Sequence, residues 1–299
     1  MTSIARLLTK FAIGACAVAG LASQVLAASP DGMKLYVFTS QPLDIAKSAL
    51  QSTVSGTEKI KIPVAFFLIK HPKGNILFDT GDNDRVIQDP TYWGPLAGLL
   101  DLGTSADLAI DTQLEKVGVK ATDINYVILG HMHLDHAGNV GKFPNATIVV
   151  QRDEIANAFW PKPGTAVSYI TTDFGMLRNG VGEGMTGKQP MIELNGDLDL
   201  LGDGSIYIHR AVSHTPGSQI ALVRLPKKGL VILTSDVCYL AESLNKNILP
   251  SIGLTYDPTG MLDAYAYIKR TRDTESGDVI FAHDPETFNA HKHSPEYYE

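Results

Sequence analysis

The hydrophobic residues of this chain fall into short runs separated by turn-forming residues. Runs of about four to eight apolar residues between Gly, Pro, Asn or Asp are typical of strands buried in a sheet. The turns His71–Gly74 and Pro226–Gly229 join two pairs of these runs into hairpins. The predicted strands are Lys34–Thr39, Ile62–Ile69, Asn75–Phe78, Ile124–Leu129, Thr147–Val150, Ile206–Val212, Ile220–Leu225, Leu230–Leu233 and Val279–Ala282.

Two segments between these runs have helical character. In Ser105–Val117 the apolar residues recur at helical spacing with charges elsewhere, and Ser105 is placed to cap the first turn. Pro258–Arg270 also reads as a helix. Residues 161–205 are rich in Gly, Pro and Asn and weakly periodic, which predicts long loops near the mouth of a site. With no internal repeat and no dividing linker, residues 28–299 are expected to form one α/β domain of two packed sheets covered by helices.

The first 27 residues have the pattern of an export signal. Arg6 and Lys10 precede an apolar stretch, Phe11–Leu21, and Val25 and Ala27 fit the small-residue rule for cleavage after residue 27. The stretch is short for a membrane span. Cleavage would place the mature protein in the periplasm or outside the cell without a stable membrane anchor. A retained anchor, or lipidation at Cys16, is the alternative.

Composition narrows the class of protein further. A chain with 44% hydrophobic and 19% charged residues is not intrinsically disordered. Its formal charge is −7, and loss of two basic residues with the leader takes it to −9, which argues against binding of nucleic acid or anionic membranes. Only two cysteines are present, so a disulfide scaffold is excluded. Cys238, which remains after cleavage, is expected to be a small buried apolar residue.

The strongest chemical signal is the segment His131-Met132-His133-Leu134-Asp135-His136, directly after a predicted strand. His131 and His133 are two residues apart, so both imidazoles point to the same side of an extended segment. Asp135 and His136 follow where the chain must turn. Imidazole and carboxylate are the groups that Zn²⁺ and similar divalent ions prefer as ligands. The segment therefore predicts a metal site.

Three further candidate ligands stand at the ends of other predicted strands. They are His214 in SHTPG, Asp236 in TSD and His283 in FAHD. Each alone is also compatible with a capping or solvated residue. Together with the first four they make seven groups, more than one zinc ion with an open position uses. The set suits two metal ions that share a bridging carboxylate.

This series, preceded by Asp79 in FDTG, resembles the metallo-β-lactamase superfamily over almost all of the chain after the leader. The resemblance implies an αβ/βα sandwich, two mixed sheets face to face with helices outside, and a binuclear metal centre. By position, His131, His133 and His214 would hold one ion, while Asp135, His136 and His283 would hold the other. Asp236 would bridge the two ions. Zn²⁺ is the first expectation, although Co, Mn or Fe is compatible with the same ligands.

Smaller signals resemble the N-acyl homoserine lactonases, enzymes of quorum quenching. These signals are Tyr239 three residues after Asp236, and the segments 149–154, 282–286 and 294–298. The resemblance implies that a bridging hydroxide attacks the carbonyl carbon of an acyl lactone, the small-molecule substrate. Tyr239 would help stabilise the oxyanion, and Asp135 would return a proton to the leaving alkoxide.

Supporting roles are less specific. Asp79 is interpreted either as an acceptor that orients a ligand imidazole or as a simple turn residue. Aromatic and apolar residues considered for an acyl-chain pocket, each equally compatible with the core, are Phe66, Phe67, Trp93, Met132, Phe159 and Trp160. Histidines expected to be structural or solvated are His71, His209, His291 and His293.

The same ligands leave other activities open. An exported organophosphate triesterase is the hardest enzyme to separate from a lactonase on this sequence. A β-lactamase fits Asp236 together with His136 less well, and a glyoxalase II-like thioesterase would have a basic helical C-terminal region that is missing here. A periplasmic metal-binding module without activity is the non-enzymatic alternative.

Overall fold

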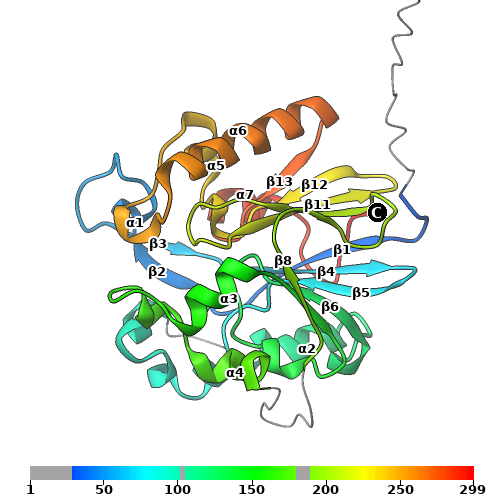
Figure 1. The fold of residues 1–299 in the computed structure, drawn as a ribbon, viewed down its shortest axis with the longest axis horizontal. Coiled ribbons are helices and arrows are strands. Elements are labelled where there is room, and N and C mark those ends of the chain that lie inside the picture. The colour runs from blue at the N-terminus through cyan, green and yellow to red at the C-terminus, as the bar shows by residue number, and fades with distance from the viewer. Residues whose placement is uncertain (1–28, 102–104, 180–188) are drawn as a thin grey trace, which may run out of the picture.

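The computed structural model describes residues 29–101, 105–179 and 189–299, and within them two mixed β-sheets pack face to face (Figure 1). The first sheet has the order β1 (Lys34–Thr39), β4 (Ala65–His71), β5 (Gly74–Phe78), β6 (Ile124–Ile128), β7 (Thr147–Gln151), β8 (Met191–Leu194). The second has the order β13 (Asp278–Ile280), β12 (Gly229–Leu233), β11 (Gln219–Leu225), β10 (Ile206–Arg210), β9 (Leu198–Asp199). Each sheet combines parallel and antiparallel pairs. The expected αβ/βα sandwich is confirmed.

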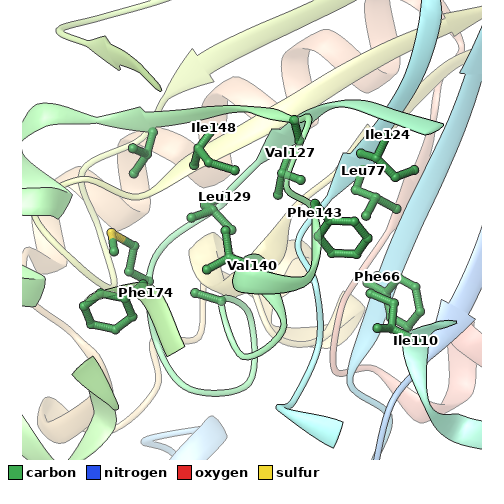
Figure 2. Packing of buried hydrophobic residues seen from close by; sticks show 14 of the residues in the cluster. Phe66, Leu77, Ile110, Ile124, Val127, Leu129, Val140, Phe143, Ile148 and Phe174 are labelled. Atoms are coloured by element: carbon green, nitrogen blue, oxygen red, sulfur yellow. The ribbon is translucent and has the colours of Figure 1, made fainter. Parts of the chain in front are cut away.

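Strand alternation separates the core into layers. Along β4, Phe67 and Ile69 face the second sheet, while Phe66 and Leu68 face the helices on the outside. Because successive strand side chains point to opposite faces, a single strand that is apolar from Ala65 to Ile69 serves both layers. Figure 2 shows the outer layer, in which Phe66, Phe143 and Val127 belong to one cluster of fully buried side chains. The two-sided burial explains why these strands read as continuous apolar runs.

Helices cover both outer faces (Figure 1). On the first sheet lie α2 (Ile110–Glu115), α3 (Arg152–Phe159) and α4 (Thr171–Asn179); on the second lie α5 (Ala241–Lys246) and α6 (Pro258–Glu275). The remaining α-helices are α1 (Lys47–Leu50) and α7 (Pro285–Ala290). Short 3₁₀ segments are η1 (Asp84–Ile87), η2 (Pro90–Leu99), η3 (Ala106–Leu108), η4 (Ala121–Asp123), η5 (Val140–Lys142), η6 (Ala166–Ser168), η7 (Ser235–Val237) and η8 (Ile252–Leu254). No helix in the described part of the chain has the length and apolar character to span a membrane.

Two predicted elements are each divided in the structure. The expected strand Ile62–Ile69 is divided at Pro63, which has no N–H for a sheet ladder. Its first residue, Ile62, belongs to β3 (Lys59–Ile62), which pairs with β2 (Leu43–Ala46) in a ribbon that the pattern did not reveal. The expected helix Ser105–Val117 is η3 followed by the shorter α2, with Ser105 capping η3 by accepting from the N–H of Asp107.

The prediction of loops through residues 161–205 is also wrong for part of the described residues of this segment. It contains α4, β8 and β9, and β8 and β9 each lie at an edge of a sheet. Edge strands are short and bury only one side, so they lack the long apolar runs that identify inner strands. The predicted leader, residues 1–27, lies outside the described residues.

Candidate metal centre

All seven predicted ligands converge at one end of the sandwich. The strands β6, β10, β12 and β13 end at residues 128, 210, 233 and 280, each just before one of the predicted ligand segments. The side chains form three overlapping groups whose ligand atoms lie within 4.8 Å of one another. These groups are His131/His133/His214, His131/His136/Asp236 and Asp135/His136/His283. The first and third match the two ligand sets predicted for separate ions, and the middle one contains the predicted bridging residue.

Asp236 lies between the two outer groups. Its Oδ2 is 3.5 Å from His214 Nε2 and 3.8 Å from His131 Nε2. Its Oδ1 is 2.9 Å from His283 Nε2 and 3.1 Å from His136 Nε2. One carboxylate oxygen therefore faces each group, which is the arrangement that a bridging ligand needs.

Hydrogen bonds from the outside fix how three of the imidazoles face the centre. His136 Nδ1 is 2.8 Å from Asp79 Oδ2, so Asp79 occupies the orienting position considered for it. His214 Nδ1 donates to the carbonyl of Leu254, and His283 Nδ1 donates to the carbonyl of Pro63, both at 2.8 Å. With Nδ1 protonated and bonded outward, each Nε2 presents its lone pair to the interior, as in protein metal sites.

Several ligand atoms at the centre of the cluster are not satisfied by hydrogen bonds to other protein groups. His131 Nε2 and Asp236 Oδ1 are buried without a hydrogen bond among the described residues. His133 Nδ1 and His214 Nε2 face each other at 2.9 Å, as do the Nε2 atoms of His136 and His283 at 3.2 Å. Buried polar atoms normally have partners, and paired imidazole lone pairs repel unless a cation lies between them. The residues therefore fit two divalent cations.

The pKa shifts of His131, His133 and Asp236 agree with metal binding, whereas for His136 and His283 the charge of Asp236 outweighs burial and raises the pKa. Burial lowers the pKa of His133 to about 3, and burial together with neighbouring His136 holds the pKa of His131 well below its ordinary value. Burial alone would raise the pKa of Asp236, but His136 and His283 hold it well below the usual range. Neutral imidazole and ionised carboxylate are the forms that bind metal.

Tyr239 lies at the edge of the same cluster, 3% exposed. Its hydroxyl is 3.1 Å from His214 Nδ1, whose proton already goes to the carbonyl of Leu254. The phenol proton is therefore not required by His214. Burial, and then the charge of Asp236, raises the pKa of Tyr239 well above its ordinary value, so the hydroxyl stays protonated at neutral pH.

A cavity of about 150 Å³ opens onto the metal cluster. Trp93 is the one residue considered for an acyl-chain pocket that lines it; Phe66, Phe67 and Met132 are in the core. The polar lining is His133, Asp135, Ser168, His214, Asp236, Tyr239 and His283. The apolar lining is Leu43, Ile45, Leu50, Ile62, Trp93, Leu96, Leu99, Leu134 and Leu254. A larger cavity of about 750 Å³ lies elsewhere and contains none of the seven ligands.

The turn after the ligand segment docks closely on the loop after β5. Gly138 N–H donates to the carbonyl of Gly81 at 3.0 Å, and its own carbonyl accepts from Asn83 Nδ2 at 2.9 Å. Asn139 in turn donates from its N–H to the hydroxyl of Thr80 at 3.2 Å and from Nδ2 to the carbonyl of Thr80 at 3.0 Å. A Cβ on Gly138 would lie less than 3.0 Å from backbone atoms of this loop. The sequence contained this signal as the glycine two residues after His136, but its partner loop could not be known.

Gly138→Ala is expected to destabilise the fold by about 2–3 kcal/mol, because the clash is with backbone that cannot rotate away. Urea unfolding monitored by circular dichroism measures the change. Gly175→Ala is the matched control, since its added methyl meets nothing within 4 Å in helix α4. That control is expected to be neutral or stabilising by up to about 1 kcal/mol. Equal stability of the two variants would contradict close docking at Gly138.

A buried carboxylate connects the wall of the cavity to α4. Asp173, 4% exposed, accepts from Asn83 Nδ2 at 2.8 Å and from the hydroxyl of Tyr92 in η2 at 2.5 Å. Its second oxygen has no hydrogen bond among the described residues. Burial raises the pKa of Asp173 to about 7, although Tyr92, Asn83 and the charge of Arg85 oppose the shift. The acid is thus largely protonated in the folded protein at pH 5.

The raised pKa of Asp173 predicts a pH-dependent stability. The unfolded chain releases this proton near pH 4 and the folded chain near pH 7, so stability falls as pH rises through that window and then levels. Asp173→Asn is expected to remove this loss. Its unfolding free energy relative to the parent protein should rise by about 2 kcal/mol from pH 5 to pH 7. Urea titrations at both pH values test this, with the exposed Asp263→Asn as control; a difference independent of pH contradicts it.

One residue that the sequence pattern did not indicate, Ser235, completes the support of His136. Ser235, buried and with φ of 45°, donates from Oγ to Asp79 Oδ2 at 2.9 Å. Asp79 itself has φ of 59° and accepts from the N–H of Gly130 at 2.6 Å. A Cβ on Gly130 would collide with the Ser235 side chain. The glycine directly before His131 was the available signal.

The remaining histidines lie outside the three ligand groups. His71 is buried, with Nε2 3.3 Å from the hydroxyl of Ser205. His209 stacks on Tyr267 with ring centroids 3.8 Å apart, and His293 stacks on Phe288. These contacts agree with the structural roles expected for them.

A sandwich of two mixed sheets with such a His/Asp cluster at the strand ends defines a metal-dependent hydrolase fold. The family described as the metallo-beta-lactamase superfamily matches residues 61–233. The chain belongs to the metallo-β-lactamase superfamily, as the motif around His131 indicated.

Within this superfamily the chain is similar to proteins named as lactonases. It is 31% identical to the N-acyl homoserine lactonase AttM of Azorhizobium caulinodans, over 89% of this chain and 99% of the relative. An N-acyl homoserine lactone hydrolase structure with N-hexanoyl-L-homoserine bound at its catalytic metal center superposes with a TM-score of 0.75 at 24% identity, covering 89% and 98% of the chains. The dizinc quorum-quenching lactonase AidC superposes with a TM-score of 0.62 at 16% identity, covering 85% and 88%.

Proposed function

We propose that the protein hydrolyses the lactone ring of N-acyl homoserine lactones with the help of two divalent metal ions. The observation that carries the proposal is the position of Tyr239, whose protonated hydroxyl lies beside the metal cluster and has no obligatory acceptor on His214. Similarity to AttM over almost the full length of both proteins supports the same substrate class. Zinc is the proposed metal, because imidazole and carboxylate ligands suit it.

The ligand groups assign the ions to side chains. His131, His133 and His214 would hold one ion; Asp135, His136 and His283 would hold the other; Asp236 faces both groups. Divalent ions bound there would polarise an ester carbonyl and lower the pKa of a water molecule so that it is nucleophilic at neutral pH.

The chain's own residues then handle charge and protons. Tyr239 donates its hydroxyl proton toward the carbonyl oxygen as negative charge develops on it. Asp135 lines the same cavity, and His136 outweighs the effect of burial to keep its pKa below the ordinary value. The ionised carboxylate can accept the proton lost by the attacking water and pass it to the ring oxygen as the C–O bond breaks.

The cavity explains why an acylated lactone suits this site. One side presents the polar groups of the metal cluster, and the other presents apolar side chains of the β2–β3 ribbon and η2, including Ile45, Trp93 and Leu96. The reacting ring would lie against the polar side while an acyl chain contacts the apolar side. Burial of the acyl chain contributes about 0.8 kcal/mol per CH₂ group.

Acid release from short- and long-chain N-acyl homoserine lactones, followed in a pH-stat, tests the function. Tyr239→Phe is expected to lower kcat by about a hundredfold with little change in KM, since it removes one donor to the oxyanion. Tyr267→Phe, which removes a hydroxyl far from the cluster, is the control and should match the parent protein. Unchanged kcat in Tyr239→Phe would show that the assigned oxyanion role is wrong.

The same assay separates the alternatives. A phosphotriesterase would turn over paraoxon at least as well as lactones, and a β-lactamase would do so with nitrocefin. A thioesterase would prefer acyl thioesters. A metal-binding module would bind the ions and hydrolyse none of these substrates.

We further propose that residues 1–27 are an export signal and that residues 28–299 act as one hydrolase domain in the periplasm or outside the cell. The basic start, short apolar stretch and small residues before position 28 support this. Mass spectrometry of protein from the periplasmic fraction and the medium tests the proposal. A mature N-terminus at residue 28 is expected; an intact leader in the membrane fraction would contradict it.

A further inference from the structure

A buried acidic residue outside the seven ligands connects two of the ligand loops. Glu154 lies in the first turn of α3, and its side chain is 0% exposed. It has no cationic partner among the described residues. Instead, four donors converge on its two oxygens, from Met132 N, Tyr169 Oη, Thr215 Oγ1 and Gly217 N. A buried carboxylate without a cation is costly unless it is fully hydrogen-bonded. Here the four donors need both acceptor oxygens of the Glu154 carboxylate.

One oxygen of Glu154 serves the first ligand loop. Oε1 accepts from the N–H of Met132, at 2.9 Å, and Met132 stands between His131 and His133. The same oxygen accepts from the hydroxyl of Tyr169 at 3.3 Å. The Tyr169 ring packs edge-on against the imidazole of His133, with centroids 4.6 Å apart. This oxygen therefore restrains both the backbone of the loop and one ligand ring.

The other oxygen serves the second ligand loop. Oε2 accepts from Thr215 Oγ1 at 2.5 Å and from the N–H of Gly217 at 3.2 Å, directly after His214. A Cβ on Gly217 would lie less than 3.0 Å from the backbone of Glu154, so loop and helix are in close contact. The two loops come from different sheets, and Glu154 bonds to both.

We infer that Glu154 is a positioning residue that holds the ligands of one metal ion, His131, His133 and His214, in register with one another. All four of its donors lie in or against the loops that carry these three histidines. None comes from the segments that carry Asp236 or His283, and the donor in the segment 131–136 is the N–H of Met132, which lies between His131 and His133 rather than beside Asp135 or His136. Its loss should therefore weaken one metal site selectively. This inference rests on one part of the proposed function, the binding of two metal ions, and does not require that the protein hydrolyse lactones.

The variant Glu154→Gln discriminates because an amide has one acceptor oxygen and one donor nitrogen. If the amide oxygen of Gln accepts from the N–H of Met132, its NH₂ group faces the N–H of Gly217. In the reversed orientation, the NH₂ group faces the N–H of Met132. In either orientation one ligand loop loses its backbone hydrogen bond and meets a donor instead. Size and burial are nearly unchanged.

Titration of the Zn²⁺-loaded full-length protein with a chromophoric chelator gives the affinity of each ion without any substrate. In Glu154→Gln one ion should bind about tenfold or more weakly while the other keeps the affinity seen in the parent protein. Asp153→Asn is the matched control, since it removes a carboxylate one residue earlier on the same helix, in an exposed ion pair with Arg210. That control should release both ions as the parent does.

Equal weakening of both ions, or no change in either, would overturn the inference. Circular dichroism shows whether Glu154→Gln folds. If it does not, Thr215→Val decides: this variant removes one of the four donors and should weaken the same single ion a few-fold. Because no lactone is involved, a parent protein that binds two ions but hydrolyses no lactone would refute the proposed function and leave this test intact.

Discussion

Asp236→Asn is expected to reduce bound divalent metal from two ions per chain to less than one and to lower kcat/KM for lactones by about a thousandfold or more. The two carboxylate oxygens of Asp236 face different ligand groups, with Oδ1 2.9 Å from His283 Nε2 and Oδ2 3.5 Å from His214 Nε2. An amide nitrogen cannot replace either oxygen as a ligand. Loss of metal-assisted charge stabilisation costs about 4 kcal/mol in the barrier, which corresponds to three decades in rate.

Metal content by inductively coupled plasma mass spectrometry and turnover by pH-stat measure the two effects together. Asp197→Asn makes the same chemical change at a partly exposed carboxylate that bonds to His209, away from the cluster. It should retain both ions and full activity. An Asp236→Asn protein that keeps two ions and normal turnover would exclude a bridging role for Asp236.

The inner strands of the fold were predictable because each forms a continuous apolar run along the sequence. The segments around Phe67, Ile128 and Leu233 are apolar at nearly every position, and only a strand buried on both faces accommodates such a run of that length. The edges were not predictable in this way. Strand β8 has one buried residue of four, so it lacks an apolar run. Strand β3 is defined by its pairing with β2, a contact between separate segments that no local sequence pattern encodes.

The ligands of the site were predictable for a related reason. His131, His133, Asp135 and His136 are adjacent in the chain, and His214, Asp236 and His283 each follow a recognisable strand, where sheets bring loops together. Of the residues that hold the ligands in place, Asp79 was indicated by the sequence, but Glu154 and Ser235 were not. Glu154 opens a short helix that was not anticipated, and Ser235 acts through a φ of 45° next to a ligand. Such roles depend on distances between segments, so they appear only in three dimensions.

The residues that support the ligands act at two different levels of the same site. Asp79 and the carbonyls of Pro63 and Leu254 orient individual imidazole rings. Glu154 instead restrains the loops on which the rings stand. Substitutions at the first level should change the affinity of an ion through one ligand, whereas substitutions at the second should move several ligands of one ion together. Site-resolved metal affinity therefore separates the two levels, while activity alone would not.

Asp135→Asn is expected to lower kcat for lactone hydrolysis by about 10²–10⁴-fold, the range typical of a lost general acid or base. The effect should depend on the leaving group. A lactone expels an alkoxide, which needs a proton as the C–O bond breaks, whereas 4-nitrophenyl acetate expels a stable phenolate. Asp135 Oδ2 is 3.5 Å from both His136 Nε2 and His283 Nε2, so its loss can also weaken the second ion.

Comparison of the two substrates separates these effects. Loss of the ion alone would reduce hydrolysis of both esters by the same factor. Loss of proton transfer should reduce kcat for the lactone about tenfold more than kcat for 4-nitrophenyl acetate. Measurements at saturating Zn²⁺ restore the ion as far as the remaining ligands permit, and the exposed Asp107→Asn serves as control. An equal loss for both substrates under these conditions would restrict Asp135 to metal binding. A selective loss of lactone hydrolysis would identify Asp135 as the group that gives the ring oxygen its proton.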